Sequence, residues 1–288
     1  MKNKIIILGS SGFIGKAISD ELRKINKNFL GFSSKDINLL LEESILKLNN
    51  QLIEGDTIIF VSALAPCKDQ EMYKKNIMMI NNFFSSIELK KIKHFLYISS
   101  DAVYEDSVDL ISENNIKSTD NYHAKMHADR EEIISSYCHN KDLNLTIVRP
   151  TLVFGPGDTH NGYGPNKFIR DVNNEKNIIL FGKGEEKRDH IYIYDLVKII
   201  IDILEKNIYG NYTLATGKVI SFYEIAKIVC NAKGIPHDHI KFSERIGPMP
   251  HNGYRAFNIT KIKSKIVDLN FTDIEEAINK SIKNLFYL

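Results

Sequence analysis

The sequence has little of what would mark a secreted, membrane-spanning or nucleic-acid-binding protein. Its three cysteines, Cys67, Cys138 and Cys230, are odd in number and far apart, which excludes a disulfide framework and favours a reducing compartment. The formal net charge is only +2, so composition gives no electrostatic reason to expect nucleic acid or an anionic membrane as a partner. No apolar run reaches membrane-spanning length, and the run at residues 5–8 is too short for the core of a signal peptide. We expect a cytoplasmic protein with no membrane partner, no nucleic-acid partner and no metal site.

The composition is that of an ordinary globular protein. Hydrophobic residues make up 43% of the chain and charged residues 26%, and no repeat or low-complexity tract interrupts them. A length of 288 residues allows one large domain or two smaller domains with a full core.

A glycine-rich turn follows the first apolar run. Residues 8–15 read Leu-Gly-Ser-Ser-Gly-Phe-Ile-Gly, so glycines stand between an apolar strand and an amphipathic helix. In this context Gly9 allows a tight turn, Gly12 lets a pyrophosphate approach the backbone, and Gly15 lets the helix pack closely on the strand. The N–H groups and the positive dipole end of the helix would then face the phosphates. The sequence therefore predicts a nucleotide-binding site at this turn.

Strand and helix signals alternate in the first half of the chain. We expect strands at 4–8, 28–32, 57–62, 94–99 and 145–149, with helices at 13–26, 70–90 and 122–139. Apolar strands separated by helices indicate an α/β fold with a doubly wound parallel sheet of the Rossmann type. A helix at 192–206 and a strand at 211–215 would return to this first domain. The expected division is 1–150 plus about 188–216 for a dinucleotide-binding domain, and about 151–187 plus 217–288 for a small discontinuous C-terminal domain.

The segment 76–84 is apolar over most of a helical circumference, which is broader than the stripe of a singly buried helix. Two explanations are open. The helix lies deep in the core, or it forms a subunit interface. The second explanation predicts a homodimer built on the helices at 70–90 and 122–139.

Two serines close the apolar strand at 94–99, and a tyrosine and a lysine follow at the start of the helix at 122–139. Ser99 and Ser100 fall at the carboxyl edge of the expected sheet, where ligands of open α/β folds bind. Together with the glycine turn, these residues resemble the extended short-chain dehydrogenase/reductase family, especially its nucleotide-sugar epimerases, dehydratases and reductases. The resemblance covers nearly the whole chain, because it continues through segments 149–155, 181–184, 188–195 and 245–247.

The resemblance implies NAD or NADP as cofactor and a nucleotide-diphosphate sugar as substrate, which the C-terminal domain would bind. The residues that it assigns to the cofactor lie in the glycine turn and after the next strands: Gly9, Ser11, Gly12, Phe13, Ile14, Gly15, Ser33, Ser34, Lys35, Ala63, Leu64, Asn76, Pro150 and Val153. The residues that it assigns to the substrate are Asp101, Asn166, Arg188 and Arg245, with the two guanidinium groups holding the diphosphate.

In this family a serine binds the reacting sugar oxygen, a tyrosine transfers the proton, and a lysine lowers the pKa of the tyrosine. Ser100 matches the serine, and Tyr122 and Lys125 are the first candidates for the pair. They stand three residues apart, whereas the family spacing is four. A second register resembles relatives with histidine at the lysine position, and it puts His123 in the tyrosine position and His127 in the lysine position. Pairing of Tyr122 with His127 is a third alternative.

Two departures from the family pattern bear on the reaction and the cofactor. Dehydratases of the 4,6 type carry an Asp-Glu pair after the catalytic hydroxyl residue, whereas this chain has Asp101-Ala102. The missing carboxylate favours hydride transfer at sugar C4, by a 4-ketoreductase or a 4-epimerase, in the synthesis of surface-glycan precursors. At the end of the second strand, Ser33, Ser34 and Lys35 favour NADP, while Asp36 keeps NAD open.

The competing class is a non-catalytic nucleotide-binding or redox-sensing module of the same fold. The irregular spacing of Tyr122 and Lys125 supports it, and the intact Ser100 opposes it.

Overall fold

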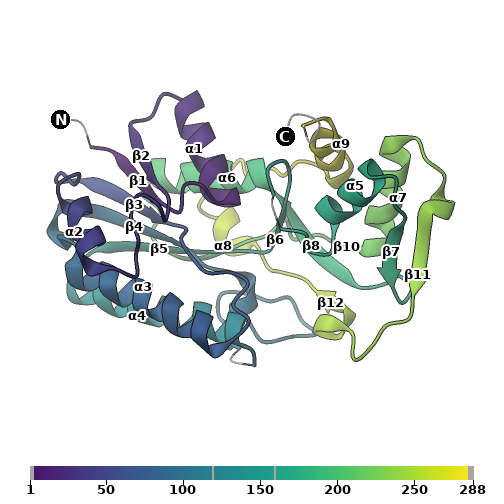
Figure 1. Cartoon of the computed structure of the whole chain (residues 1–288), viewed down its shortest axis with the longest axis horizontal. Helices are drawn as coiled ribbons and strands as arrows, with labels where there is room; N and C mark the ends of the chain where they lie inside the picture. The colour runs from purple at the N-terminus through teal and green to yellow at the C-terminus, as the bar shows by residue number, and fades with distance from the viewer. Residues whose placement is uncertain (1–2, 119, 159, 285–288) are drawn as a thin grey trace. The chain divides into compact units, whose positions relative to one another are not determined.

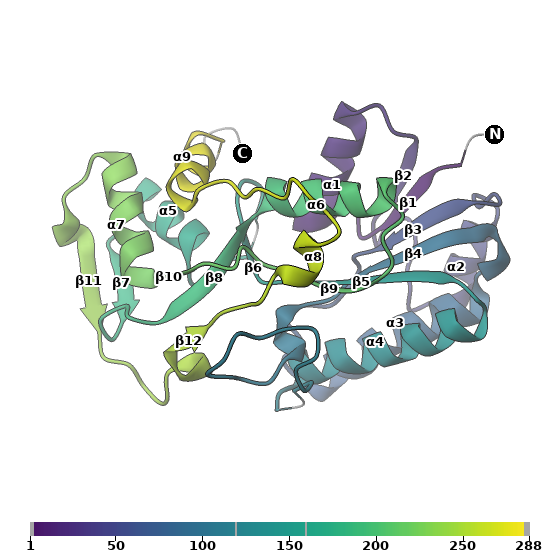
Figure 2. The ribbon, with the colours of Figure 1, turned by 180° about the vertical axis from the view of Figure 1, so that it is seen from behind.

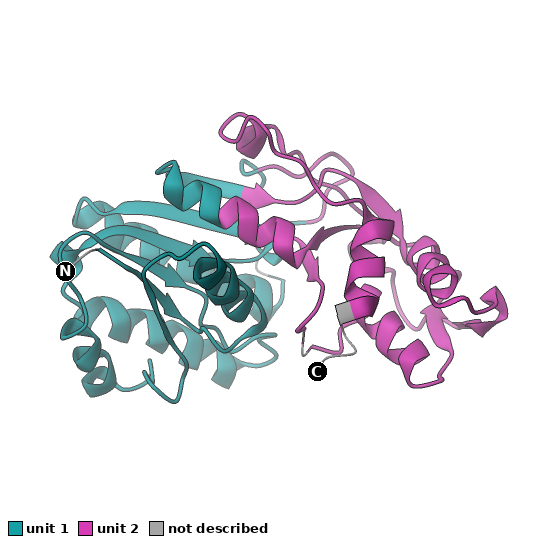
Figure 3. Cartoon of the chain, turned by 90° about the horizontal axis from the view of Figure 1, so that it is seen from above, with its two compact units in different colours: residues 1–105, 113–150, 201–212 teal, residues 106–112, 151–200, 213–288 magenta. Residues whose placement is uncertain are grey.

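The computed structural model (Figures 1 and 2) describes residues 3–118, 120–158 and 160–284. Its contacts divide the chain into two compact units (Figure 3). Unit 1 contains the residues up to 105, 113–150 and 201–212, and unit 2 contains 106–112, 151–200 and the residues from 213 onwards. The sequence-based division placed 188–216 with the first domain. Residues 188–200 belong to unit 2 instead, because the strand at 187–192 pairs with strands of that unit.

Unit 1 is built on a six-stranded sheet. Its strands are β1 (Ile5–Leu8), β2 (Phe29–Phe32), β3 (Asp56–Phe60), β4 (Ile92–Ile98), β5 (Asn144–Pro150) and β9 (Gly210–Leu214). Their order across the sheet is β2-β1-β3-β4-β5-β9, and the pairs from β2 to β5 are parallel. Parallel strands end at the same edge, so the chain segments after β1, β2, β3 and β4 emerge together, where α/β sheets bind their ligands.

Helices pack on both faces of this sheet (Figures 1 and 2). On one face lies α1 (Phe13–Lys24) with residues 201–205 of α6 (Ile193–Glu205); on the other lie α2 (Glu42–Asn49), α3 (Gln70–Ser86) and α4 (Tyr122–Asn140). An apolar core fills the space between the strands and the second group of helices, and within it the rings of Phe60, Phe83 and Phe95 pack on one another. Burial on both faces explains why the strands are almost wholly apolar.

The apolar segment 76–84 lies on α3, and most of its apolar side chains are buried inside unit 1. Met79, Ile80 and Phe83 are buried in the core, whereas Met78 is 48% exposed. These positions favour the deep-core explanation of the segment. The homodimer stays a prediction. Most of the apolar surface that motivated it is buried inside unit 1.

Unit 2 holds two smaller sheets and the remaining helices. One sheet contains β6 (Leu152–Phe154), β8 (Lys187–Tyr192), β10 (Val219–Ser221) and β12 (Tyr254–Arg255), and β8 pairs with each of the other three. The second sheet pairs β7 (Ile178–Phe181) with β11 (Ile240–Ser243). The helices are α5 (Pro165–Asn173), α7 (Phe222–Lys233), α8 (Thr260–Lys263) and α9 (Ile274–Asn284), besides residues 193–200 of α6.

Short 3-10 turns complete the chain at Leu89–Lys91, Asp101–Val103, His237–His239 and Pro250–Gly253. Within the described ranges, no helix combines the length and the hydropathy that crossing a membrane requires. The three cysteines are free thiols, and all three are buried.

His94 on β4 makes the stability of unit 1 depend on pH. Its Nε2 lies 2.8 Å from Oγ1 of Thr146 on β5, and its ring packs on the ring of Tyr209. Burial lowers the pKa of His94 to about 4. The unfolded chain therefore binds a proton at this residue below about pH 6.5 that the folded chain does not bind. The stability is fully present above about pH 6.5 and is lost as the pH falls towards 4.

We predict that His94→Gln, which keeps a hydrogen-bonding group for Thr146 but does not titrate, flattens this dependence. Between pH 7 and pH 5, His94 accounts for a loss of about 2 kcal/mol in the free energy of unfolding. Urea unfolding of both proteins at the two pH values measures the difference. Equal losses in the variant and the parent would contradict this role of His94.

Candidate functional site

The glycine turn leaves the start of α1 open to an anionic ligand. Gly9 has a φ of +94°, and a Cβ on Gly15 would lie 2.1 Å from the carbonyl oxygen of Gly9, so both positions require glycine. In the described chain no side chain caps α1 and no acidic residue lies in its first turn, so the N–H groups around Ser11, Phe13 and Ile14 meet no protein carboxylate. This cradle fits the diphosphate of a dinucleotide.

The end of β2 carries a carboxylate as well as the predicted serines. Asp36 accepts hydrogen bonds from the backbone N–H of Ser33 at 2.8 Å and from its hydroxyl at 2.6 Å, and these bonds lower the pKa of Asp36. Ser34 and Lys35 are exposed beside this pair. Of the three residues predicted to favour NADP, Ser33 is therefore already engaged, whereas Ser34 and Lys35 are accessible.

Asn76 on α3 holds the loop that follows β3. Its Oδ1 accepts the N–H of Leu64 at 2.9 Å, and its Nδ2 donates to the carbonyl of Leu64 at 3.0 Å. The side chain is fully buried, so it acts on a cofactor through Leu64 rather than by direct contact. The loop begins next to the glycine turn, because a Cβ on Gly9 would lie 2.9 Å from the backbone nitrogen of Ser62. The structure thus brings Ala63 and Leu64 to the predicted nucleotide site.

Ser100 caps the 3-10 turn that ends β4. Its Oγ accepts the N–H of Ala102 at 3.1 Å, and its hydroxyl makes a long contact of 3.5 Å with Oδ1 of Asp101. Asp101 is buried, and the side chain of Ser100 is half-buried. The Ser100 hydroxyl therefore remains able to donate to a ligand at the edge of the sheet.

Tyr122 and Lys125 lie on the side of α4 that faces α3. Tyr122 is 41% exposed, and its ring packs on the ring of Tyr73 with 6.3 Å between the centroids. The Nζ of Lys125 binds Oδ2 of Asp129 at 2.8 Å, and the hydroxyl of Tyr73 donates to the same oxygen at 2.5 Å. Both predicted catalytic side chains are thus engaged with α3 and their own helix.

His123 and His127 lie on the side of α4 that faces the sheet. The Nδ1 of His127 lies 3.0 Å from the hydroxyl of Tyr97 on β4. The Nδ1 of His123 accepts the N–H of Cys67 at 3.4 Å, and the two histidine rings meet edge to face with 4.9 Å between centroids. A spacing of four residues keeps both rings on one helical face. The structure therefore directs the second register, and not the first, towards the end of β4.

Burial keeps this pair neutral. It lowers the pKa of His123, although the charge of Asp101 acts in the opposite direction. It lowers the pKa of His127 well below the usual value, and the charges of His123 and Arg130 add to the effect. Burial also raises the pKa of Tyr97 to about 12. The Tyr97 hydroxyl therefore stays protonated, and its hydrogen bond with Nδ1 of His127 joins two neutral groups.

A buried ion pair that the sequence analysis did not assign fixes α4 against the sheet. Glu131 on α4 accepts two hydrogen bonds from Arg149 on β5, from Nε at 2.8 Å and from Nη2 at 2.7 Å. It also accepts one from the hydroxyl of Ser99 at 2.6 Å. Burial by itself would raise the pKa of Glu131, but the hydrogen bonds and charge of Arg149 outweigh it and lower the pKa. The network joins α4 to the ends of β4 and β5.

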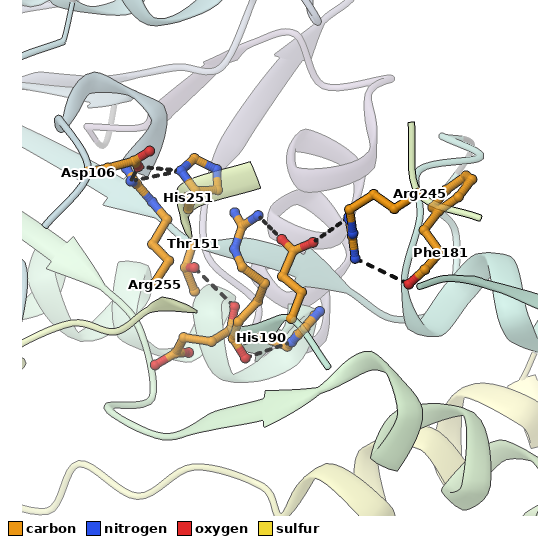
Figure 4. Close-up of polar contacts among 10 residues, drawn as sticks. Asp106, Thr151, Phe181, His190, Arg245, His251 and Arg255 are labelled. Carbon is orange, nitrogen blue, oxygen red and sulfur yellow. Dashed lines mark hydrogen bonds and ion pairs between the residues drawn. The ribbon is translucent and has the colours of Figure 1, made fainter. Parts of the chain in front are cut away.

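Unit 2 holds a second polar cluster, around Arg188 on β8 (Figure 4). The Nη1 of Arg188 donates to Oε1 of Glu186 at 3.2 Å, and the Nη1 of Arg245 lies 3.9 Å from Oε2 of the same buried carboxylate. Arg245 also donates to the carbonyl of Phe181 at 3.2 Å. The structure therefore brings together the two arginines predicted to hold a diphosphate, with the unpredicted Glu186 between them.

A third arginine adjoins this cluster. Arg255 on β12 stands opposite Arg188 in the parallel pair of β12 and β8, and it is 1% exposed. Its Nη1 donates to Oδ1 of Asp106 at 2.7 Å, and Nδ1 of His251 contacts the same oxygen (Figure 4). Burial lowers the pKa of His251, and the nearby charge of Arg188 lowers it further. The sequence analysis missed Arg255 because no motif that it used surrounds this residue.

The side chain of Asn166 on α5 forms hydrogen bonds with other residues of unit 2. Its Nδ2 donates to the carbonyl of Gly155 at 3.1 Å and to Oδ2 of Asp158 at 2.7 Å, and its Oδ1 accepts the N–H of Gly155 at 3.2 Å. The amide thus fixes the loop after β6. Val153 lies on β6 and Pro150 ends β5. The contacts predicted for these three residues stay predictions.

A family model and two related sequences match the chain. A model of the NAD dependent epimerase/dehydratase family matches residues 5–215. The chain is 27% identical, over 269 aligned residues, to dTDP-D-glucose 4,6-dehydratase of Dictyostelium discoideum, and covers 62% of that protein with 79% of its own length. It is 25% identical over 318 aligned residues to an uncharacterised UDP-glucose epimerase of Bacillus subtilis, with 98% of both chains covered. The chain therefore spans less than two thirds of the first relative and nearly all of the second.

Solved structures show the same fold. UDP-glucose 4-epimerase of Thermus thermophilus, solved with NAD, superposes with a TM-score of 0.86 at 16% identity, and 99% of each chain is covered. UDP-N-acetylglucosamine 4-epimerase of Methanobrevibacter ruminantium, in complex with UDP-N-acetylmuramic acid, also superposes with a TM-score of 0.86, at 21% identity and 99% coverage of both chains. These neighbours confirm the predicted Rossmann-type α/β fold.

The arrangement around Glu186 makes a prediction about anion binding. Glu186→Gln keeps the side-chain shape but removes the negative charge between Arg188 and Arg245. We expect the affinity for inorganic pyrophosphate to rise about tenfold, equivalent to about 1.4 kcal/mol. Isothermal titration calorimetry measures the change. Glu175, an exposed residue of unit 2, changed to Gln, is the matched control with the same change in net charge and is expected to have little effect. Equal effects of the two variants would mean that Glu186 does not face the anion.

Proposed function

Because the chain belongs to the NAD dependent epimerase/dehydratase family, we propose that it transfers a hydride at C4 of a nucleotide-activated sugar. It is an NAD(P)-dependent enzyme of nucleotide sugars. One observation carries the proposal: the uncapped start of α1, the Ser100 hydroxyl and the His123–His127 pair all lie at the carboxyl ends of parallel strands of one sheet. That edge is where a dinucleotide and its substrate meet in folds of this class.

The residues present fit NAD or NADP. The start of α1 would bind the diphosphate, and the loop of Ala63 and Leu64 would lie beside it. The cofactor, when bound, supplies or accepts the hydride. A solved neighbour of the same fold, a GDP-L-fucose synthetase of Naegleria fowleri, binds NADP. The preference for NADP over NAD stays a prediction, because Lys35 favours a 2′-phosphate whereas the carboxylate of Asp36 disfavours it.

The substrate that we propose is a nucleotide-diphosphate sugar. The names of the two sequence relatives support this class, since one acts on a dTDP-sugar and the other is called a UDP-glucose epimerase. In unit 2, Arg188 and Arg245 supply guanidinium groups that suit a diphosphate. Supply of precursors for surface glycans, and a cytoplasmic location in keeping with the three free cysteines, belong to the same proposal.

The chemistry of the 3-10 turn after β4 favours hydride transfer without loss of water. Asp101 is buried on this turn, and the next residue is Ala102, which carries no acid. Elimination of water next to a ketone needs a base that removes a proton from the neighbouring carbon and an acid that protonates the leaving hydroxyl. The turn offers the one carboxylate of Asp101 for these two proton transfers. A 4-ketoreductase or a 4-epimerase needs no such base.

The proton transfer in this proposal belongs to His123, with Ser100 donating a hydrogen bond to the reacting sugar oxygen. The N–H of Cys67 points at Nδ1 of His123, so the neutral ring carries its one proton on Nε2. That N–H gives its proton to the reacting sugar oxygen as the hydride arrives, and the ring regains a proton from solvent once the product has left. His127, fixed by Tyr97, supports the ring of His123 from one helical turn further along. Tyr122 and Lys125, which face α3, take no part in this arrangement.

Four variants test the assignment. We predict that His123→Ala lowers the single-turnover rate by about 10²–10⁴-fold, the usual range for general acid–base catalysis. His127→Ala should also be severely impaired. Tyr122→Phe and Lys125→Met are the matched controls on the other helical face, and each should lose less than about threefold, far below that range.

If Tyr122→Phe and Lys125→Met instead lose far more activity than the two histidine variants, Tyr122 is the proton-transferring residue and Lys125 is the cation that lowers its pKa. If all four variants and the parent bind a dinucleotide but none turns over any nucleotide sugar, the chain is a binding module and the catalytic proposal fails.

A further inference from the structure

Arg130 on α4 is a fully buried cation with no counter-ion. Its Nη2 donates to the carbonyl of Ser62 at 2.7 Å, and its Nη1 donates to Oδ1 of Asn76 at 3.2 Å. Among the residues that the structure describes, no carboxylate lies within ion-pair distance, and its Nε has no hydrogen-bond partner. Arg149, the other fully buried arginine of unit 1, is paired in two places with Glu131. An unpaired buried guanidinium is costly, so its charge needs an explanation beyond packing.

The groups around Arg130 stabilise its positive charge without neutralising it. The guanidinium carbon lies 5.2 Å from the centroid of the Tyr97 ring and 5.4 Å from that of Phe60, so two aromatic faces stabilise the cation. Burial lowers the pKa of Arg130, and Tyr97 acts against this change. Because an arginine starts above pH 12, the group stays protonated at neutral pH. Neither ring carries a formal charge, so the local net charge remains positive.

The position of Arg130 links the two halves of the proposed cofactor site. On one side it binds the carbonyl of Ser62, whose backbone packs against Gly9 of the diphosphate cradle. On the other side it lies over Tyr97, whose hydroxyl binds His127 next to His123. The cation therefore sits behind the carboxyl ends of β3 and β4, between the anionic part of a dinucleotide and the proposed reacting centre.

We propose that Arg130 is a positioning residue whose fixed charge makes this site bind the reduced dinucleotide more tightly than the oxidised one. The inference rests on the proposed function, because it assumes that NAD(P) occupies this edge. The diphosphate is equally negative in both redox forms and is attracted in both. The nicotinamide ring is cationic when oxidised and neutral when reduced, so a fixed cation in a poorly solvated place opposes the oxidised form alone. In the bound complex, such a site shifts the hydride-transfer equilibrium towards the reduced cofactor and the 4-keto sugar.

Three variants separate the charge of Arg130 from its shape. Arg130→Met removes the charge at similar volume, Arg130→Lys keeps the charge, and Asn76→Asp places a carboxylate where Nη1 now meets an amide. Isothermal titration calorimetry of each protein with NADPH, NADP⁺, NADH and NAD⁺ gives the affinity ratio of reduced to oxidised cofactor. A thermal melt of each ligand-free protein gives its stability.

We expect Arg130→Met to weaken the reduced forms about tenfold and the oxidised forms about threefold or less, at ordinary effective dielectric constants. Asn76→Asp should shift the ratio in the same direction, and Arg130→Lys should keep it within about twofold of the parent. The free Arg130→Met protein should melt no lower than the parent, because an unpaired buried charge has been removed.

Equal losses for both redox forms in Arg130→Met and Asn76→Asp would overturn the inference and leave Arg130 a structural residue. If Arg130→Met fails to fold, Asn76→Asp decides by the same ratio. A parent protein that binds no dinucleotide would refute the proposed function itself, whereas a parent that binds with an unchanged ratio in the variants would refute this inference alone.

Discussion

The geometry of the proposed cofactor site depends on the bidentate ion pair between Glu131 and Arg149. Both side chains are buried, and Ser99 and Tyr104 satisfy further positions of the pair. Lys117 lies 3.0 Å from the carboxylate of Glu131, whereas Arg149 has Glu131 as its counter-ion. Removing Glu131 would leave Arg149 as a buried charge without that partner, so the pair holds the helix α4 in one rotational setting against β4 and β5. That setting turns positions 123, 127 and 130 towards the sheet and positions 122, 125 and 129 towards α3. Our proposal that His123 rather than Tyr122 transfers the proton rests on this setting.

The arginines of the chain fall into two kinds. Arg149 in unit 1, and Arg188, Arg245 and Arg255 in unit 2, each lie near a carboxylate. Within the described chain, Arg130 has none. A guanidinium with a protein carboxylate is held in place before a ligand arrives, at the cost of weaker attraction for an anion. A guanidinium without one contributes its whole charge to whatever binds nearby. We propose that Arg188 and Arg245 shape a phosphate site in unit 2, whereas the charge of Arg130 biases the cofactor site in unit 1.

The sequence predicted the fold closely where local pattern decides the outcome. The glycine turn and the strands β1 to β5 lie within a few residues of their expected places, because buried parallel strands and tight turns have strong local signatures. The eight-residue helix α2 was not expected, and neither was the pairing of β8 inside unit 2, which depends on contacts with distant strands. The orientation of α4 was open in the sequence, since Tyr122 and His123 are neighbours. The contact of His127 with Tyr97, thirty positions earlier, favours one register. The missing counter-ion of Arg130 is likewise a property of packing that no local pattern shows.

Transfer of deuterium is the most direct measurement of the central claim. The protein would be mixed with NADPD or NADD, labelled at C4 of the nicotinamide, and with UDP- and dTDP-activated 4-keto sugars, and the products would be analysed by mass spectrometry and NMR. The account predicts one deuterium at C4 of the sugar, with the nucleotide still attached. Tight binding of both ligands with no deuterium in the sugar, or a product that has lost water, would contradict it.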